Sequence, residues 1–448
     1  MRQSKPLILL LSIILLTSIS CLRDRGSDMN LGELRVTPNP IDLTQNIFGN
    51  PVPLRFMNVG FDTLRVDSVS FNNEALSVNI QNFELAPENS RNVTLRFNYE
   101  SFDGSGGVSM TVHLREQENE SITIFTPFKR ILRNISDHPS NNFGADISPD
   151  GNRILFYSTR TGSHDIFSAD IEGDNTQQHT SDGFNNIPIS YLDNNRILMK
   201  SDRSGVMQGY ILNVASRDLT PITETDLPTY PVKFNSNETQ LLYYTENPDG
   251  TRDSWLRNFE TNQLFRLNSE DRDRDYRKYT PVAFIESETR VLLHAELGLV
   301  SKAFVVRTDG EALFNIYDDE WSYIPVAWSE SDLRVLGFSN RNLRRNIVTF
   351  GASGNDFREI TTGPRLEFPV ALSNDEQIVI YYSDQDDGIN VFYTTFTGSN
   401  SERVTANPYE DFPVTIGPDN NTILFNTRRD TYGGQRFYQV YTTVARQL

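Results

Sequence analysis

Cysteine is almost absent from this chain, and its scarcity limits how the folded protein can be stabilised. The 448 residues contain a single cysteine, Cys21, so no disulfide can form within the chain. Histidine is scarce too, and none of the five stands four residues from another, the spacing of a helical metal site. We therefore expect domains held together by their apolar cores, with no resident metal or cofactor.

Positive charge is also in short supply. Lys and Arg number 41 against 59 Asp and Glu, which gives a formal net charge of −18. Such an acidic chain is a poor match for the phosphates of nucleic acid and for anionic lipid head groups. We therefore expect no nucleic-acid partner, and either a solvated acidic surface or a basic partner.

Long apolar runs are missing except at the start of the chain. Arg2 and Lys5 precede a run from Leu7 to Leu16 that only Ser12 interrupts. A basic start followed by a short apolar run predicts an export signal, because the run is too short for a permanent membrane-spanning helix.

The residues that follow this run resemble the lipobox of bacterial lipoproteins. Ser18-Ile19-Ser20-Cys21 places small residues before a cysteine, with Ser where the family most often has Leu. The resemblance implies that residues 1–21 hold the signal and the acylated Cys21, which anchors the protein in a membrane. Leu22, rather than Asp, implies the outer membrane of a Gram-negative envelope, facing the periplasm or the cell surface. Loss of the two basic signal residues changes the net charge from −18 to −20, and residues 22–30 would form a tether.

Residues 31–127 alternate apolar and polar side chains in short runs. Examples are Leu64-Arg65-Val66, Val93–Phe97 and Met110–Leu114, and turn signals such as Asn58-Val59-Gly60 separate them. Seven or so short strands in this length predict an immunoglobulin-like β-sandwich.

The order of features in this segment resembles the ASH family of immunoglobulin-like domains. The resemblance depends on Phe56–Gly60 followed by Leu64-x-Val66-x-x-Val69, and on Leu85–Ser90 followed by Val93-x-Leu95-x-Phe97. It implies a spacer or binding module without catalysis.

The dipeptide Pro-Val recurs through the remaining residues at a nearly constant spacing. It occurs at Pro231, Pro281, Pro325, Pro369 and Pro413, at intervals of 50, 44, 44 and 44 residues. Pro188-Ile189 lies 43 residues before the first of these, and Gly144-Ala145 lies 44 residues before that. A period near 44 indicates a four-stranded β unit repeated around an axis. Residues 128–448 are therefore predicted to form a β-propeller in an all-β protein.

The copies predict both the number of blades and the closure of the ring. Seven copies begin at 144, 188, 231, 281, 325, 369 and 413, which favours seven blades, with six blades and one degenerate copy as the alternative. The last copy lacks an outer strand. Arg130–Ser136 has the pattern of an outer strand, so we expect strand 130–136 to pair into the last blade.

The first copy is similar to the WD40-like (PD40) repeat of TolB-type propellers. The similarity lies in Ser148-Pro149-Asp150-Gly151, Ile154-Leu155-Phe156-x-Ser158-x-Arg160 and Asp165-Ile166-Phe167. The Ser-x-Arg element returns with Arg203 and Arg341, and as Asn426-x-Arg428. The resemblance implies a non-catalytic role in protein interaction within the cell envelope.

The order of strands in each copy predicts a candidate binding face. The connections from second to third strand and from outer to inner strand emerge at the same end of the sheets, and Arg and aromatic side chains there would make good hot spots. The alternative is that Ser-x-Arg only braces the blades. The candidate residues are Arg160, Arg203, Arg341, Arg428, Tyr230, Trp321, Tyr323 and Tyr409.

Signals of catalysis are weak. His164 and His294 fall in or near different blades, and some PD40-type propellers are sugar lyases that assemble histidines across blades; scattered surface histidines are the interpretation we favour. Asp384–Gly388 resembles half a calcium loop but lacks the bidentate Glu of an EF-hand, so an acidic turn is the simpler interpretation. Asp271–Asp275 alternates charge within the longest repeat and is predicted to be a solvated loop.

Two functions follow from these observations. The leading hypothesis is a non-catalytic cell-envelope lipoprotein whose propeller is a scaffold for a protein or peptide partner. The alternative is an envelope propeller that binds or degrades polysaccharide through a metal or an acidic channel.

Overall fold

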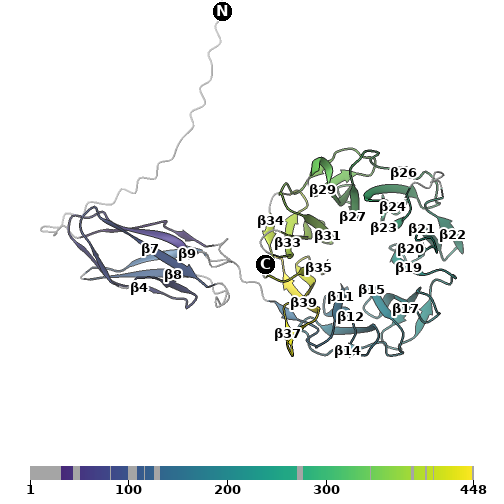
Figure 1. The fold of residues 1–448 in the computed structure, drawn as a ribbon, viewed down its shortest axis with the longest axis horizontal. Helices are drawn as coiled ribbons and strands as arrows, with labels where there is room; N and C mark the ends of the chain where they lie inside the picture. Colours follow the sequence, from purple (N-terminus) through teal and green to yellow (C-terminus); the bar gives the residue numbers. More distant parts are fainter. Residues whose placement is uncertain are drawn as a thin grey trace, which may run out of the picture. The chain divides into compact units, whose positions relative to one another are not determined.

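The computed structural model describes residues 32–43, 51–80, 82–98, 108–115, 117–125, 132–269, 276–343, 345–384, 388–398, 401–406 and 408–445. The chain divides into two compact units, residues 1–127 and 128–448. The regular elements of the described residues are strands, apart from the 3-10 turn η1 (Arg341–Leu343) (Figure 1). In the described residues, no helix has the length and apolarity to cross a membrane. The predicted signal, Cys21, the tether, and residues 271–275 and 385–387 lie outside the described residues.

The first unit is a sandwich of two sheets. One sheet has the order β1-β3-β7-β5 and the other the order β2-β9-β8-β4-β6, with β2 parallel to β9. Buried side chains from both sheets form one core, as the alternation along the strands predicts. The strands are β1 (Leu34–Thr37), β2 (Ile41–Asp42), β3 (Val52–Asn58), β4 (Leu64–Phe71), β5 (Leu76–Val78), β6 (Phe83–Leu85), β7 (Ser90–Phe97), β8 (Ser109–Leu114) and β9 (Glu120–Phe125).

The second unit is a ring of seven four-stranded antiparallel sheets, which Figure 1 shows around a common axis. The all-β propeller that the repeat predicts is therefore confirmed, with seven blades. Blades 1 to 3 are β11 (Asn142–Ile147), β12 (Arg153–Ser158), β13 (Asp165–Asp170) and β14 (Gln177–Gln178); β15 (Asn186–Asp193), β16 (Arg196–Ser201), β17 (Gln208–Asn213) and β18 (Leu219–Pro221); and β19 (Thr229–Phe234), β20 (Gln240–Glu246), β21 (Arg252–Asn258) and β22 (Gln263–Arg266).

Blades 4 to 6 continue in the same order. They are β23 (Thr280–Ile285), β24 (Arg290–Leu297), β25 (Val300–Arg307) and β26 (Phe314–Asn315); β27 (Tyr323–Ser329), β28 (Arg334–Ser339), β29 (Asn346–Gly351) and β30 (Arg358–Glu359); and β31 (Glu367–Leu372), β32 (Ile378–Ser383), β33 (Asn390–Thr395) and β34 (Ser401–Arg403).

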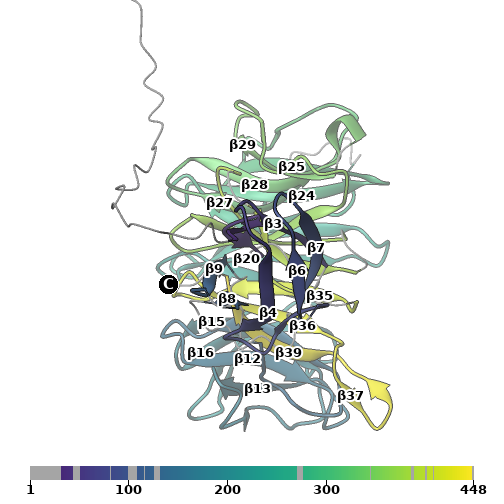
Figure 2. The same ribbon diagram turned by 90° about the vertical axis from the view of Figure 1, so that its left-hand side faces the viewer.

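Blade 7 is made from both ends of the propeller sequence. It contains β35 (Asp411–Ile416), β36 (Thr422–Thr427), β39 (Gln439–Val444) and, as the outer strand, β10 (Arg133–Asn134). The hairpin of β37 (Thr431–Tyr432) and β38 (Gln435–Arg436) projects from this blade (Figure 2). β10 pairs antiparallel with β39, and the Ser136 hydroxyl donates a 2.9 Å hydrogen bond to Gln439 Oε1. The ring is therefore closed by residues that are about 300 positions apart in the sequence.

The repeated Pro-Val marks a β-bulge in the innermost strands of blades 3 to 7. In β27, Pro325 pairs with Gly337 and Ala327 with Leu336, so Val326 has no partner across the ladder. The innermost strand of a blade is paired on one side only, so a proline is tolerated where its missing N–H would face the axis of the ring. The bulge increases the local twist of the strand. The same shift follows Pro188, Pro231, Pro281, Pro369 and Pro413.

Blade 1 has Gly144 where the other blades have proline. The Gly144 N–H donates a 2.8 Å hydrogen bond to Asn426 Oδ1 in blade 7, which a proline could not make. A Cβ at this position would lie 3.1 Å from Leu424 Cδ2. The exception to the repeat therefore occurs where the ring closes.

Adjacent blades share apolar cores. One cluster combines Leu155 and Ile166 of blade 1 with Tyr191, Ile197 and Met199 of blade 2, all of them buried. Burying a side chain of this size contributes about 1.5–3 kcal/mol to the free energy of unfolding. A sheet with a neighbour on one side only would gain this contribution on one face and not on the other. Ring closure gives every blade two covered faces.

At the end of the sheets where first strands turn into second strands, side chains of one blade bind the turn of the preceding one. Glu288, Glu330 and Glu376 accept hydrogen bonds from the backbone N–H groups of Ser236, Ser287 and Glu330, at 2.6, 2.8 and 2.9 Å. We call this end the turn face and the opposite end the loop face.

Candidate binding face of the propeller

A layer of buried polar side chains lies under the loop face. In blade 1 it consists of Asn142, Ser158 and Asp165, at the loop-face ends of the first three strands, and all three are at most 1% exposed. Thr180 completes the layer, since its hydroxyl donates a 2.7 Å hydrogen bond to Asp165 and accepts one of 3.0 Å from the Ile166 N–H. Buried polar groups are costly unless they are paired, so this layer fixes the strand ends.

The layer repeats with a spacing that the sequence analysis missed. In five blades a backbone N–H near the start of the third strand donates to a side chain 14 residues further on; the donor is the second residue of the strand in four of them and the third residue, Ser254, in blade 3. In blade 7 the Val440 N–H donates to Ser136. A recurring hydroxyl or amide at that distance is the signal that could have revealed it. The five acceptors are Thr180, Thr223, Asn268, Thr361 and Thr405.

Arg160 and Arg203 bind this polar layer with their guanidinium groups. Arg160 donates to Ser158 Oγ at 2.9 Å and to Asn142 Oδ1 at 3.0 Å, and its guanidinium lies 4.5 Å from the centre of the Phe167 ring. Arg203 makes the equivalent bonds in blade 2 and an ion pair of 2.7 Å with Asp182. Both side chains brace their own blades.

The counterpart of these arginines in blade 7 is Arg429, one residue beyond the predicted Arg428. Arg429 donates to Thr427 Oγ1 at 3.3 Å and forms a 2.8 Å ion pair with the buried Asp411. Thr427 is fully buried and occupies the layer position of Ser158, so the register differs from Asn426-x-Arg428 by one residue. Arg428 is exposed and lies over the ring of Tyr438.

Arg341 follows the same element in blade 5. Its backbone N–H donates a 3.1 Å hydrogen bond to Ser339 Oγ, and its guanidinium lies 4.7 Å from the centre of the Phe357 ring. Among the described residues it has no carboxylate partner.

The four predicted aromatic residues have different environments. Tyr323 is fully buried and donates a 2.8 Å hydrogen bond to Asp319, so its predicted place on a binding surface is wrong. Trp321 is half-buried against the core of blades 4 and 5, and its carbonyl accepts a hydrogen bond from the buried Lys302. Tyr409 is half-buried and accepts a 2.6 Å hydrogen bond from Arg436. Tyr230 is half-buried and stacks on Tyr244.

Tyr230 belongs to a series of rings that we call the aromatic belt. Each member is adjacent in sequence to a buried polar residue near the loop-face end of a strand, and most of them are half-buried. Rings of adjacent blades meet in it: the centroids of Phe338 and Phe368 are 5.2 Å apart, and those of Tyr438 and Phe143 5.1 Å apart. The belt consists of Phe143, Tyr157, Tyr230, Tyr244, Phe338, Phe368, Tyr382, Phe412 and Tyr438.

Charged groups surround the Tyr230 part of the belt. Glu246 accepts a 3.1 Å hydrogen bond from the Tyr230 hydroxyl, and Arg252 lies over the Tyr244 ring and pairs with Glu246 at 2.8 Å. Burial, followed by this hydrogen bond, raises the pKa of Tyr230 to about 12, so the phenol stays neutral. Burial lowers the pKa of Lys200, whose ammonium lies 4.9 Å from the centre of the Tyr230 ring.

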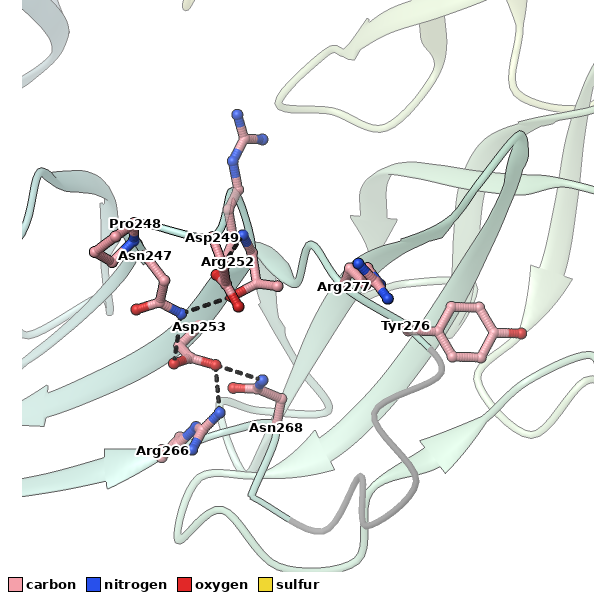
Figure 3. A pocket seen from close by; sticks show the side chains of 10 residues that line it. Asn247, Pro248, Asp249, Arg252, Asp253, Arg266, Asn268, Tyr276 and Arg277 are labelled. Carbon is pink, nitrogen blue, oxygen red and sulfur yellow. Dashed lines mark hydrogen bonds and ion pairs between the residues drawn. The ribbon is translucent and has the colours of Figure 1, made fainter.

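A polar pocket of about 540 Å³ opens beside Arg252 (Figure 3). Asp253 lies at its centre and accepts hydrogen bonds from Asn268 at 3.0 Å, from Asn247 at 3.1 Å and from Arg266. Burial alone would raise the pKa of Asp253, but these hydrogen bonds and the charge of Arg266 hold it below its ordinary value. The charges facing this pocket are thus largely paired within the protein.

The histidines of the propeller are far from forming a metal centre. His164 lies in the β12–β13 connection of blade 1, and His294 lies on β24 of blade 4, across the ring. His179 Nε2 is 2.8 Å from Ser168 Oγ, and burial, Arg153 and Arg217 lower its pKa to about 4. Within the described ranges, no three His, Cys, Asp or Glu side chains come together as metal ligands.

Comparisons with solved structures identify this fold. Oligogalacturonate lyase in complex with manganese matches with a TM-score of 0.54 and 13% identity, over 77% of this chain and 95% of that one. Puromycin hydrolase matches with a TM-score of 0.52 and 8% identity, over 68% of this chain and 52% of that one. TolB from Acinetobacter baumannii gives a TM-score of 0.43, with 11% identity over 68% of this chain and 78% of that one, which is too low to support an argument. No protein-family model matches the sequence, and no curated protein is similar to it.

The chain is thus a β-propeller protein with the fold of oligogalacturonate lyase. At such low sequence identities, structural similarity shows a shared fold and does not show a shared function.

Proposed function

We propose that the propeller is a non-catalytic scaffold that binds a protein or peptide partner on its loop face. The observation that supports this most is the aromatic belt together with arginines that stack on its rings, Arg252 over Tyr244 and Arg428 over Tyr438. Half-buried aromatic and arginine side chains at one face have the composition of interface hot spots. The adjacent polar layer holds the strand ends rigid, which limits the entropy lost on binding.

Site-specific photo-crosslinking in cells that produce the protein tests this proposal. A benzophenone amino acid replaces Tyr230 or Phe368 in the belt, and in a control it replaces Phe259, which is exposed in the turn after β21 at the opposite end of the sheets. We expect the two belt positions to give light-dependent adducts of the same mass, and the control to give none. Adducts from Phe259 alone, or equally from all three positions, would contradict a partner on the loop face.

The second candidate function is binding or cleavage of an envelope polysaccharide. The observation in its favour is the shared fold with oligogalacturonate lyase. Metal analysis of the purified protein, with a glycan array, separates the two functions. Stoichiometric metal together with glycan binding that is lost on changing His164 or His294 would support the polysaccharide function and count against the scaffold.

We also propose that Cys21 carries the lipid that anchors the protein in the outer membrane of a bacterial envelope. The support is the sequence around Cys21 and the absence of any other thiol in the chain. Mass spectrometry of the mature N-terminus is expected to find an acylated cysteine, and the Cys21→Ser variant is expected to leave the membrane fraction. An unmodified thiol on a mature protein would overturn this proposal.

A further inference from the structure

A second pocket on the loop face lies between blades 5 and 6. It has a volume of about 580 Å³, and its walls come from the end of η1, from the β30–β31 connection and from the residue that follows β32. Its lining includes Leu343, Arg345, Arg365 and Asp384.

The two arginines of this pocket are exposed, and neither forms an ion pair with a residue that the structure describes. Neither Arg345 nor Arg365 approaches a carboxylate within salt-bridge distance among the described residues. The arginines at the other end of blade 5 behave differently, since Arg334 and Arg358 both pair with Asp356. In a chain with a net charge of −18, two unpaired guanidinium groups in one pocket are an unusual use of positive charge.

Leu343 forms an apolar rim beside these guanidinium groups. Its side chain is 88% exposed, and its φ of 61° lies in the left-handed region, which bulky residues seldom adopt. The Leu343 N–H donates a 3.0 Å hydrogen bond to the Asn340 carbonyl, which holds this turn. A large apolar side chain kept in solvent by a strained turn favours a role in binding.

The described lining of the pocket carries more positive than negative charge. Asp384 accepts a 2.9 Å hydrogen bond from the Leu366 N–H and so fixes one wall. Glu367 follows this wall in the sequence and is buried, and burial raises the pKa of its carboxyl group. Among the described residues that line the pocket, two arginines stand against one carboxylate, Asp384.

We propose that this pocket binds an acidic peptide segment, in which Asp or Glu carboxylates pair with Arg345 and Arg365 and an adjacent apolar side chain packs on Leu343. Guanidinium groups pair with carboxylates in bidentate geometry, and such pairs give specificity as well as affinity. The inference depends on the proposed scaffold function, because it states the chemistry of the partner on the same face.

Selection from a random dodecapeptide library displayed on phage tests this proposal with the purified protein. The test variant is R345Q/R365Q. The control variant is R217Q/R358Q, which loses the same charge from exposed arginines of the β17–β18 turn and of β30. We expect selected peptides with Asp or Glu beside an apolar residue. Their affinity should fall at least about tenfold in the test variant, stay within about twofold in the control, and weaken with added salt.

The outcomes separate this inference from the scaffold proposal. Selected peptides without acidic residues, or acidic ones that bind R345Q/R365Q as tightly as the unchanged protein, would overturn the inference. If such peptides are released by Phe368→Ala, the scaffold proposal still holds. Peptides that no loop-face substitution affects would contradict both.

Discussion

At the scale of single residues, the loop-face arginines fall into two groups according to what their guanidinium groups touch. Arg160, Arg203 and Arg429 are half-buried and donate to side chains of the polar layer. Arg428 and Arg345 are exposed. The first group stabilises the blades, and the second is free to bind a ligand.

This division gives a prediction about stability. Arg160→Ala and Arg203→Ala should each lower the free energy of unfolding by about 1–3 kcal/mol, because each leaves buried acceptors such as Asn142 Oδ1 without a donor. Arg428→Ala is the matched control and should change it by less than about 0.5 kcal/mol. Urea unfolding measures all three. Equal losses in the three variants would show that the two groups do not differ.

At two positions of the loop face, the prediction from the sequence differed from the structure. The last repeat offers both Asn426-x-Arg428 and Thr427-x-Arg429, and only the complete burial of Thr427 decides between them. Tyr323 stands two residues before a repeated proline, as does the buried Asn186, so its burial could have been predicted from the repeat. Its aromatic ring suggested a surface contact instead.

At the scale of the element, the bulge in each innermost strand explains the Pro-Val repeat. The sequence predicts the period, the strands and the seven blades. It does not predict the bulge, because an unpaired residue in a ladder depends on the partner strand and not on local preference. The polar layer is hidden for a similar reason, since its members are common residues whose meaning comes from their spacing.

Deleting the bulge residue Val326 should be far more damaging than deleting a residue of an exposed turn. The deletion joins Pro325 to Ala327, so both stay opposite their partners in β28, and the bulge with its added twist is lost from the innermost strand of blade 5. We expect a loss above about 3 kcal/mol or failure to fold. Deletion of Gly205, in an exposed turn of blade 2, serves as control and should retain most of the stability measured by thermal unfolding.

The turn-face hydrogen bonds between blades should make the propeller sensitive to acid. Burial would raise the pKa of Glu376, but hydrogen bonds from Ser331, Ser329 and the backbone of Glu330 lower it overall. A carboxylate with a lowered pKa in the folded state stabilises the protein above its unfolded pKa, and this contribution is lost as the pH falls below about 4.5.

Unfolding experiments between pH 7 and pH 3 test this contribution. Glu376→Gln should lower the stability by about 1–2 kcal/mol at pH 7 and reduce the loss between pH 5 and pH 3. Glu260→Gln is a control, because Glu260 is exposed in the β21–β22 turn. A variant at position 376 with an unchanged pH profile would show that this carboxylate does not hold blades 5 and 6 together.

At the scale of the whole propeller, closure depends on contacts between its first and last residues. β10 pairs with β39, Ser136 bonds to Gln439, and Asn426 accepts from the Gly144 N–H. These contacts turn seven sheets, each stabilised by its neighbours, into one cooperative unit. A loop face made from all seven blades requires this closure.

The most direct test of this account compares two proteins, residues 128–448 and residues 137–448. Calorimetry measures the thermal unfolding of each, and hydrogen exchange measures the protection of the Val440 amide. The account predicts one cooperative transition for the longer protein. For the shorter one it predicts a large drop in melting temperature and fast exchange at Val440, whose N–H donates to Ser136. Equal melting temperatures and equal protection at Val440 would contradict a ring closed by β10.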